Sequence, residues 1–248
     1  MIENSVVIIP TYNEALNVQP MIEVLFELYP HISILIIDDN SPDKTSMVVE
    51  SLKTIHSRLY LIKRSGKLGL GTAYLEGFGW ALLQKYEFIF QMDCDFSHDP
   101  KDLQNLQNSL INENAQLAIG SRYSDSAIRT KDWPLHRLIL SYTAAYVLRA
   151  LTGLKIKDAL GGFKCFRRDA LEKINTKNII SKGFVFQFEI NYKIHSLGLK
   201  IIEVPIIFSQ RIMGSSKMNF NIILEALKVL FQLRFKKILG KLNSSESD

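Results

Sequence analysis

Two aspartates separated by one residue, Asp93 and Asp95, follow an apolar run and are the side chains of this sequence best suited to hold a metal. The run at residues 87–90 predicts a buried strand, which places both aspartates at its carboxyl end, where open α/β sheets bind ligands. Side chains two positions apart share one face of a strand. Two such carboxylates suit Mg²⁺ or Mn²⁺, with the phosphates of a nucleotide as further ligands. The alternative is that both are solvated turn residues. Asp99, before Pro100, is assigned only to a helix cap.

Two further carboxylates follow the first two apolar runs of the chain. Glu14 comes after the first run and Asp39 ends the second. Because parallel strands end at the same edge of a sheet, we expect both to lie near the aspartate pair. Carboxylates repel phosphates unless they hold a metal or accept hydrogen bonds from a base or a ribose. We therefore assign Glu14 and Asp39 to a nucleoside, with Tyr12 packing on the base. A favourable charge at a helix N-terminus is the alternative for Glu14.

Apolar runs alternate with amphipathic patterns along the first half of the chain. Runs that predict strands lie at residues 6–9, 34–37, 59–62, 87–90 and 117–119. This alternation predicts an α/β fold with a mostly parallel, Rossmann-like sheet and helices on both faces. A late strand at residues 200–208 is interrupted by Pro205 and is expected at an edge of the sheet.

The composition restricts the kind of partner. The 248 residues carry a formal net charge of +5, and 47% of them are hydrophobic, enough for a full core. The excess of positive charge favours an anionic partner such as a nucleotide or a phospholipid surface, whereas the scattered basic residues argue against nucleic acid. Cys94 and Cys165 do not form a paired spacing, which indicates a reducing compartment. The first five residues lack the basic region of a secretory signal.

Motifs along nearly the whole chain resemble those of the family 2 glycosyltransferases with the GT-A fold, and within them the dolichyl- or polyprenyl-phosphate mannosyltransferases. The early motifs alone mark only family 2, while Ser97, His98 and Pro100 and the late Arg211 and Lys217 narrow the resemblance to the polyprenyl-phosphate branch. The matching segments are residues 10–14, 38–43, 68–74, 92–100, 120–123, 181–187, 203–206 and 211–217.

The resemblance implies a function and a set of site residues. It implies transfer of mannose from GDP-mannose to a polyprenyl (dolichyl) phosphate with inversion, which yields polyprenyl-phosphate mannose and GDP, with Mg²⁺ or Mn²⁺ as the cofactor. The metal is assigned to Asp93 and Asp95. The implied acceptor-phosphate residues are Arg122, Arg137 and Ser141, and the implied catalytic residues are Asp95, Arg122, Arg211 and Lys217. The implied donor-binding residues are Pro10, Tyr12, Glu14, Ile37, Asp39, Asp93, Cys94, Asp95, Arg122, Arg211 and Lys217.

The acceptor phosphate can act as the nucleophile without a catalytic base, and several of the assigned residues have an alternative role. A lipid monophosphate has a second pKa of about 6 and is mostly dianionic at neutral pH, so no strong general base is needed. Some relatives carry Gln where this chain has Ser97, which leaves the third metal ligand open. Surface charge is the alternative for Arg211 and Lys217, and a snorkelling side chain for Arg137. Another family 2 transferase using UDP-glucose or a different nucleotide sugar, and a noncatalytic nucleotide-binding membrane module, remain the alternatives for function.

The domain organisation follows from the same resemblance. We expect one GT-A domain at residues 1–240, followed by a disordered tail at 241–248. Within the domain, residues 1–123 form the nucleotide-sugar-binding half, residues 124–217 the acceptor-binding half, and residues 218–240 an amphipathic helix at the membrane surface.

Membrane attachment is predicted from the last of these segments. Residues 218–240 predict an amphipathic helix with a basic end, a pattern typical of an interfacial helix; packing against the domain or a partner is the alternative. No uncharged apolar stretch approaches the ~18 residues of a membrane span, whereas relatives often carry C-terminal transmembrane helices. We therefore expect peripheral binding to the cytoplasmic face of a membrane, the plasma membrane in a prokaryote or the endoplasmic reticulum in a eukaryote, or a small membrane-anchoring subunit.

Overall fold

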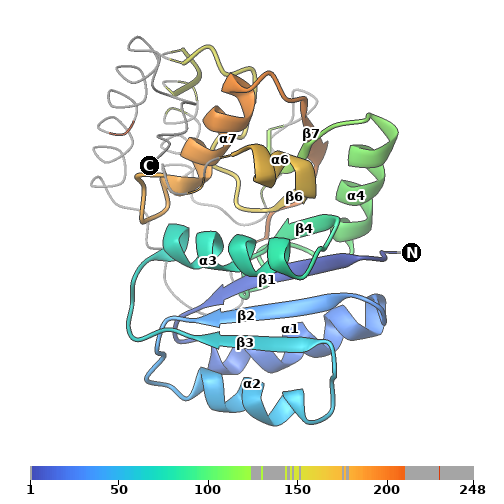
Figure 1. Ribbon diagram of the computed structural model, residues 1–248, viewed down its shortest axis with the longest axis vertical. Helices are drawn as coiled ribbons and strands as arrows, with labels where there is room; N and C mark the ends of the chain where they lie inside the picture. The colour runs from blue at the N-terminus through green and yellow to red at the C-terminus, as the bar shows by residue number, and fades with distance from the viewer. Residues whose placement is uncertain are drawn as a thin grey trace.

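The computed structural model describes residues 2–123, 130, 143, 146, 148–150, 152–174, 176, 179–209 and 229. The described residues form one sheet in the order β3-β2-β1-β4-β6-β5-β7 (Figure 1). Its strands are β1 (Ser5–Thr11), β2 (Ser33–Asp38), β3 (Leu59–Lys63), β4 (Phe88–Gln91), β5 (Leu117–Ser121), β6 (Lys164–Arg167) and β7 (Ile201–Pro205). The described helices are α1 (Ala15–Leu28), α2 (Thr45–Lys53), α3 (Leu70–Leu83), α4 (Asp102–Asn112), α6 (Arg168–Lys173) and α7 (Phe186–Ser196).

The sheet is mostly parallel, as the alternating pattern predicts. Strand β1 pairs in parallel with β2 and β4, β2 pairs in parallel with β3, and β5 pairs in parallel with β7. The late strand ends at Pro205 and lies at the edge of the sheet, which confirms its predicted position. A proline is tolerated there because an edge strand has backbone groups that pair with no neighbour.

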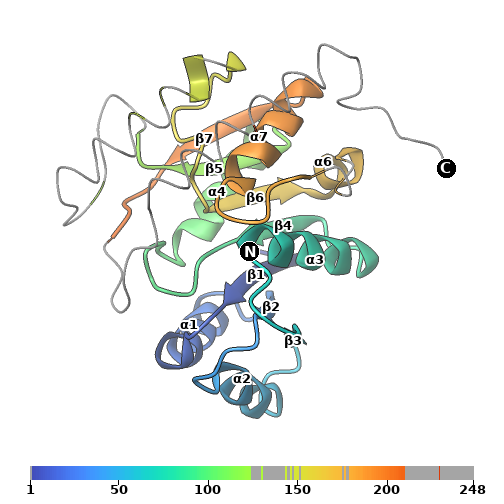
Figure 2. The same cartoon turned by 90° about the vertical axis from the view of Figure 1, so that its left-hand side faces the viewer.

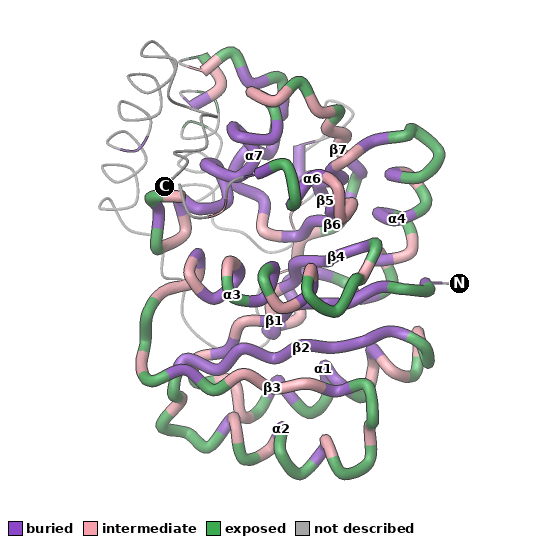
Figure 3. Tube along the Cα trace, in the orientation of Figure 1, coloured by how far each residue is buried: buried purple, intermediate pink, exposed green. Residues whose placement is uncertain are grey.

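Helices cover both faces of the sheet because successive strand residues point to opposite sides (Figure 2). In β1, Val6 and Ile8 pack with α3, α6 and α7, whereas Val7 and Ile9 pack with α1, α2 and α4. All four side chains are fully buried. The tube in Figure 3 shows β1 and β2 as buried segments between helices whose outer turns are exposed. The predicted two-sided α/β architecture is therefore confirmed.

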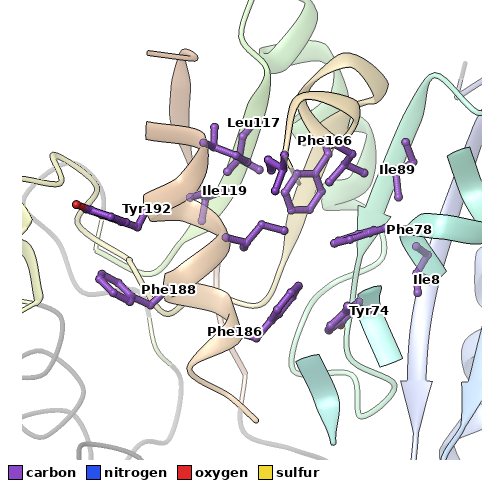
Figure 4. Close-up of a cluster of buried hydrophobic side chains, with 14 of the residues drawn as sticks. Ile8, Tyr74, Phe78, Ile89, Leu117, Ile119, Phe166, Phe186, Phe188 and Tyr192 are labelled. Atoms are coloured by element: carbon purple, nitrogen blue, oxygen red, sulfur yellow. The ribbon is translucent and has the colours of Figure 1, made fainter. Parts of the chain in front are cut away.

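Aromatic rings join the first half of the chain to the second on the α3 side (Figure 4). The ring of Tyr74 stacks on that of Phe186 with centroids 6.0 Å apart. Phe78 meets Phe166 edge-on at 5.2 Å. Since Tyr74 and Phe78 belong to α3, Phe186 to α7 and Phe166 to β6, these contacts hold distant segments of the chain against one sheet.

The sequence pattern missed strand β6 and placed some element boundaries wrongly. Strand β6 lies antiparallel between β4 and β5, with Lys164 paired to Gln91 and Ile119. Its four residues, Lys-Cys-Phe-Arg, are too few to predict a strand, and they do not show the alternation of polar and apolar types that marks one. Strand β4 ends at Gln91, two residues before Asp93.

The C-terminal segment predicted to bind a membrane lies almost entirely outside the residues that the structure describes. The predicted helix at 218–240, apart from Val229, and the predicted tail at 241–248 lie outside the described residues. Within the part of the chain that the structure describes, no helix is long and apolar enough to cross a bilayer.

The packing of α3 on the sheet can be tested with two glycines of the same helix. A Cβ on Gly77 would lie 2.7 Å from Ile8 Cγ2 and 2.8 Å from Ile37 Cδ1, whereas a Cβ on Gly79 would meet nothing within 4 Å. We expect Gly77→Ala to lower the free energy of unfolding by about 1–3 kcal/mol through overpacking. Gly79→Ala should raise it by about 0.5–1 kcal/mol, because alanine is the better helix former. Urea denaturation measures both values, and equal effects would contradict this packing.

Candidate active site

The predicted carboxylates gather beyond the carboxyl ends of β1, β2 and β4, as their positions in the sequence indicated. Glu14 follows β1, Asp39 follows β2, and the aspartate pair follows β4. Burial raises the pKa of the Cys94 thiol, and the negative charges of Glu14, Asp95 and Asp93 raise it further. Strand β1 pairs in parallel with both β2 and β4, so the segments that follow these three strands begin at the same edge of the sheet.

The aspartate pair lies in a loop, not on the strand. Strand β4 ends at Gln91, so the alternation of a strand does not set the directions of Asp93 and Asp95, and that part of the prediction is wrong. Asp95 is buried, and its Oδ1 accepts a hydrogen bond from the Ser97 N–H at 3.1 Å. Phe96 between them has a φ of +58°, which turns the chain sharply.

A hydrogen bond to the backbone holds the side chain of His98. The N–H of Asp93 donates to His98 Nδ1 at 3.4 Å, so that nitrogen acts as an acceptor. The imidazole also stacks on Phe163, with ring centroids 4.9 Å apart. These contacts hold the backbone of the loop at residues 92–99, which we call the aspartate loop, against the core.

The donor atoms in this loop fit a hard divalent cation. Carboxylate oxygens from Asp93 and Asp95 are the ligand type that Mg²⁺ and Mn²⁺ prefer. Ser97 Oγ is buried without a hydrogen-bond partner among the described residues, and it follows Asp95 by two positions. Within the described part of the chain, however, no three His, Cys, Asp or Glu side chains gather as a complete metal site. A cation here would therefore need further oxygen ligands, which a diphosphate supplies.

Asp39 is held by an arginine that the sequence analysis missed. Arg64 Nη1 lies 2.5 Å from Asp39 Oδ1, and the side chains of both residues are almost fully buried. The N–H of Gly69 donates to the other carboxylate oxygen at 3.2 Å. Arg64 also donates to the Gly69 carbonyl and to Thr72 Oγ1. Asp39 is therefore fixed in one orientation by the glycine-rich segment that opens α3.

The start of α1 positions Glu14. Its N–H donates to Thr45 Oγ1 at 3.0 Å, and its carboxylate accepts a 2.7 Å bond from Asn17 Nδ2. Asp43 accepts hydrogen bonds from the N–H groups of Ala15 and Thr45, at the start of α1 and of α2. Burial acts to raise the pKa of Asp43, but these bonds and the Thr45 hydroxyl outweigh it and lower the pKa. Two helix N-termini are thereby tied together beside Glu14.

Tyr12, Pro10, Ile37 and Cys94, all predicted to bind the donor, differ in their exposure and in what their side chains contact. Lys67 Nζ lies over the Tyr12 ring, 4.1 Å from its centroid. The side chain of Ile37 packs under α3 and that of Cys94 belongs to the core on the other face, so either would meet a ligand through its backbone. Pro10 lies beside Ile37 in the sheet, partly exposed.

Arg122 is held by a buried aspartate that the sequence analysis did not single out. Its Nε and Nη2 donate to Asp158 at 2.7 and 2.6 Å, and its backbone N–H donates to the same carboxylate at 3.0 Å. Glu203 in β7 accepts the N–H of Asp158 at 2.8 Å. Burial acts to lower the pKa of Arg122, but the charge of Asp158 outweighs it and raises the pKa, and Asp93 adds to this effect. The guanidinium is therefore charged and close to Asp93.

Four of the predicted site residues belong to segments that the structure does not describe. Arg137 and Ser141, assigned to the acceptor phosphate, and Arg211 and Lys217, assigned to the donor diphosphate, lie outside the described residues. Among the described residues, the site consists of Glu14, Asp39, the aspartate pair and Arg122, which follow the carboxyl ends of β1, β2, β4 and β5.

These findings agree with comparisons to known proteins. Residues 6–175 match the Glycosyl transferase family 2, which is more than half of the chain, and the chain belongs to this family. It is 39% identical over 226 residues to the polyprenol monophosphomannose synthase of Mycolicibacterium smegmatis, covering 91% of this chain and 84% of the relative. It is 35% identical over 220 residues to the undecaprenyl-phosphate mannosyltransferase of Micrococcus luteus, covering 89% of each.

Solved structures confirm the GT-A fold. A glucosyl-3-phosphoglycerate synthase from Mycobacterium tuberculosis, in complex with Mn²⁺, UDP and glucosyl-3-phosphoglycerate, matches with a TM-score of 0.63 at 17% identity and covers 98% of this chain and 81% of that one. A mannosyltransferase from Pyrobaculum calidifontis, in complex with GDP-Man and Mn²⁺, matches with a TM-score of 0.58 at 17% identity and covers 99% and 66%. At this identity the likeness is one of fold.

The Arg64–Asp39 pair leads to a stability prediction. We expect Arg64→Met to lower the free energy of unfolding by about 3 kcal/mol, because it leaves a buried carboxylate without its cation. The double variant Arg64→Met with Asp39→Asn should lose less than the single variant, since the unpaired charge is gone. Lys63→Met, which breaks an exposed pair with Glu50, is the control and should cost less than about 1 kcal/mol. Urea denaturation gives these values, and a double variant as unstable as the single one would contradict the assignment.

Lys164, buried in β6, leads to a pH prediction. Burial lowers the pKa of its amine well below 10.5, although the charge of Asp158 partly opposes this. The unfolded chain then binds the Lys164 proton more readily than the folded chain, so its contribution to stability rises as the pH increases toward 10.5. We expect the free energy of unfolding of the wild type, relative to Lys164→Met, to increase between about pH 8 and pH 10. Lys101→Met, at an exposed lysine, is the control, and a pH-independent difference for Lys164→Met would contradict the prediction.

Proposed function

We propose that this enzyme transfers mannose from GDP-mannose to a polyprenyl phosphate, with inversion at the anomeric carbon and with Mg²⁺ or Mn²⁺. The observation that carries the proposal is the gathering of Glu14, Asp39 and the aspartate pair at one sheet edge beside Arg122, in a chain whose relatives are named for this transfer. The GDP-Man and Mn²⁺ bound by a structural neighbour support the choice of donor and metal class.

The donor nucleotide would bind along the edge formed by β1, β2 and β4. Asp39, fixed by Arg64 and Gly69, is oriented to accept hydrogen bonds from the nucleoside, and Glu14 lies at the next strand. Asp93 and Asp95, with Ser97 Oγ nearby, would hold the cation, which neutralises the diphosphate as it departs. Arg211 and Lys217, by the family resemblance, would contact the same diphosphate.

The acceptor phosphate would attack in line from the Arg122 side of the site. A dianionic phosphate needs no general base, so positioning and charge account for the chemistry. The Asp158 carboxylate holds the Arg122 guanidinium in one plane with two hydrogen bonds, which keeps its positive charge fixed near the reaction centre. Arg137 and Ser141 are the further residues proposed for this phosphate.

The lipid acceptor requires a membrane, so we propose peripheral binding to the cytoplasmic face. The predicted amphipathic helix at 218–240, or a small anchoring subunit, would supply the attachment. Flotation with anionic liposomes at low salt tests the first route, and protein that stays at the bottom of the gradient would exclude it.

The function is tested by offering radiolabelled GDP-mannose, UDP-glucose and UDP-GlcNAc with polyprenyl phosphate and Mg²⁺ or Mn²⁺. We expect label from GDP-mannose alone in the organic phase, loss of product with a chelator, and recovery when the metal returns. Product from a UDP-sugar would change the donor assignment, and no lipid product with any donor would favour the noncatalytic alternative.

A paired substitution tests the metal assignment. We expect Asp95→Ala to lower turnover by about 10²–10³-fold, because the charge on the leaving diphosphate loses its support. Asp99→Ala is the matched control: this aspartate is exposed and its carboxylate accepts the Lys101 N–H at the start of α4, so turnover should stay within about twofold. Near-normal turnover of Asp95→Ala at saturating metal would contradict the assignment.

A further inference from the structure

Behind the aspartate loop lies a buried polar pair, Lys164 and Gln187, that none of the assignments above uses. Lys164 Nζ contacts Gln187 Oε1 at 2.6 Å and the Gln187 carbonyl at 3.0 Å. Both residues are fully buried, Lys164 in β6 and Gln187 in the first turn of α7. In either protonation state the amine has N–H groups for both oxygens, so the amide must turn its oxygen toward Lys164.

This contact fixes where the amide nitrogen points. Gln187 Nε2 is buried and has no hydrogen-bond partner among the described residues. A Cβ built on Gly162 would lie 3.6 Å from Gln187 Nε2, 3.9 Å from His98 Cε1 and 4.0 Å from Asp93 Oδ1. The amide donor and the carboxylate acceptor therefore border the same small region, which Gly162 leaves without a side chain.

The chemistry of the two groups selects the ligand atom. An ionised carboxylate only accepts hydrogen bonds, and an amide nitrogen only donates them. A hydroxyl group does both, so it can donate to Asp93 and accept from Gln187 at the same time. An ionised phosphate oxygen only accepts hydrogen bonds, so it could bond to Gln187 but not to Asp93. A buried donor without a hydrogen-bond partner destabilises the protein. A bound hydroxyl that accepts this hydrogen bond removes that penalty and therefore strengthens ligand binding.

We propose that Gln187, oriented by Lys164, and Asp93 form a subsite in front of Gly162 that binds a hydroxyl of the sugar to be transferred. The inference rests on the proposed function in that it takes the ligand to be a nucleotide sugar. It adds a contact that distinguishes the sugar nucleotide from the free nucleotide. Lys164 is a positioning residue, which acts through the orientation of Gln187.

The test compares binding of GDP-mannose with binding of GDP by isothermal titration calorimetry in Mg²⁺. Gln187→Glu keeps the size and can pair with Lys164 but loses the donor, and Gly162→Ala fills the region with a methyl at ordinary contact distances. We expect each to weaken GDP-mannose binding about tenfold and to leave GDP binding within about twofold. Gly79→Ala, whose Cβ would meet nothing within 4 Å, is the matched control and should change neither.

The outcomes separate this inference from the proposed function. Equal weakening of both ligands, or no change in either, would overturn the subsite. If the wild type binds UDP-glucose instead of GDP-mannose, the donor assignment fails, and the subsite is judged from the same variants with UDP-glucose against UDP. If the wild type binds the sugar nucleotide no more tightly than the free nucleotide, the subsite is overturned but the proposed function is not. If the wild type binds no nucleotide at all, the subsite and the proposed function are both overturned.

Discussion

The structure depends on the insertion of strand β6 between β4 and β5. Antiparallel backbone pairing on both sides of β6 makes one continuous sheet from strands that come from both halves of the chain. It brings Lys164 beside Gln91 and places Gly162 against the aspartate loop that follows β4. The loop after β4 is thus bordered by a segment about 70 residues away in sequence. That segment contributes Lys164, whose position beside β4 does not follow from the order of the predicted strands.

Burying charge near this edge imposes the second constraint. An isolated buried ion is strongly destabilising, so each charge that must face the ligand needs a partner behind it. Arg64 lies behind Asp39, and Asp158, itself held by Glu203, lies behind Arg122. These pairs place an opposite charge beside each buried charge and limit the rotamers of both side chains. Under the proposed function, a site built in this way would be preorganised for the charge that develops on a departing diphosphate.

Local patterns predicted much of this arrangement. The alternation of strands and helices predicted the two-sided parallel sheet, and Pro205 predicted the edge strand. Position after a strand also brought Glu14, Asp39 and the aspartate pair to one edge. The direction of Asp93 and Asp95 was wrongly argued from strand alternation, because β4 stops at Gln91 and a turn at Phe96 takes over. A boundary of this kind depends on sheet pairing, which a window of sequence does not contain.

The sequence by itself determined the fold class and the family and predicted the groups that meet the ligand, because periodicity and motif spacing are local properties of the chain. Only the tertiary structure decided which groups stand behind them. Arg64, Asp158 and the Lys164–Gln187 pair carry no distinctive spacing relative to the residues they support. Asp158 is 36 residues from Arg122, and Gln187 is 23 residues from Lys164. Such partners are selected by burial, since a charged or polar atom removed from water must find whatever complementary group the packed sheet and helices bring within hydrogen-bond distance.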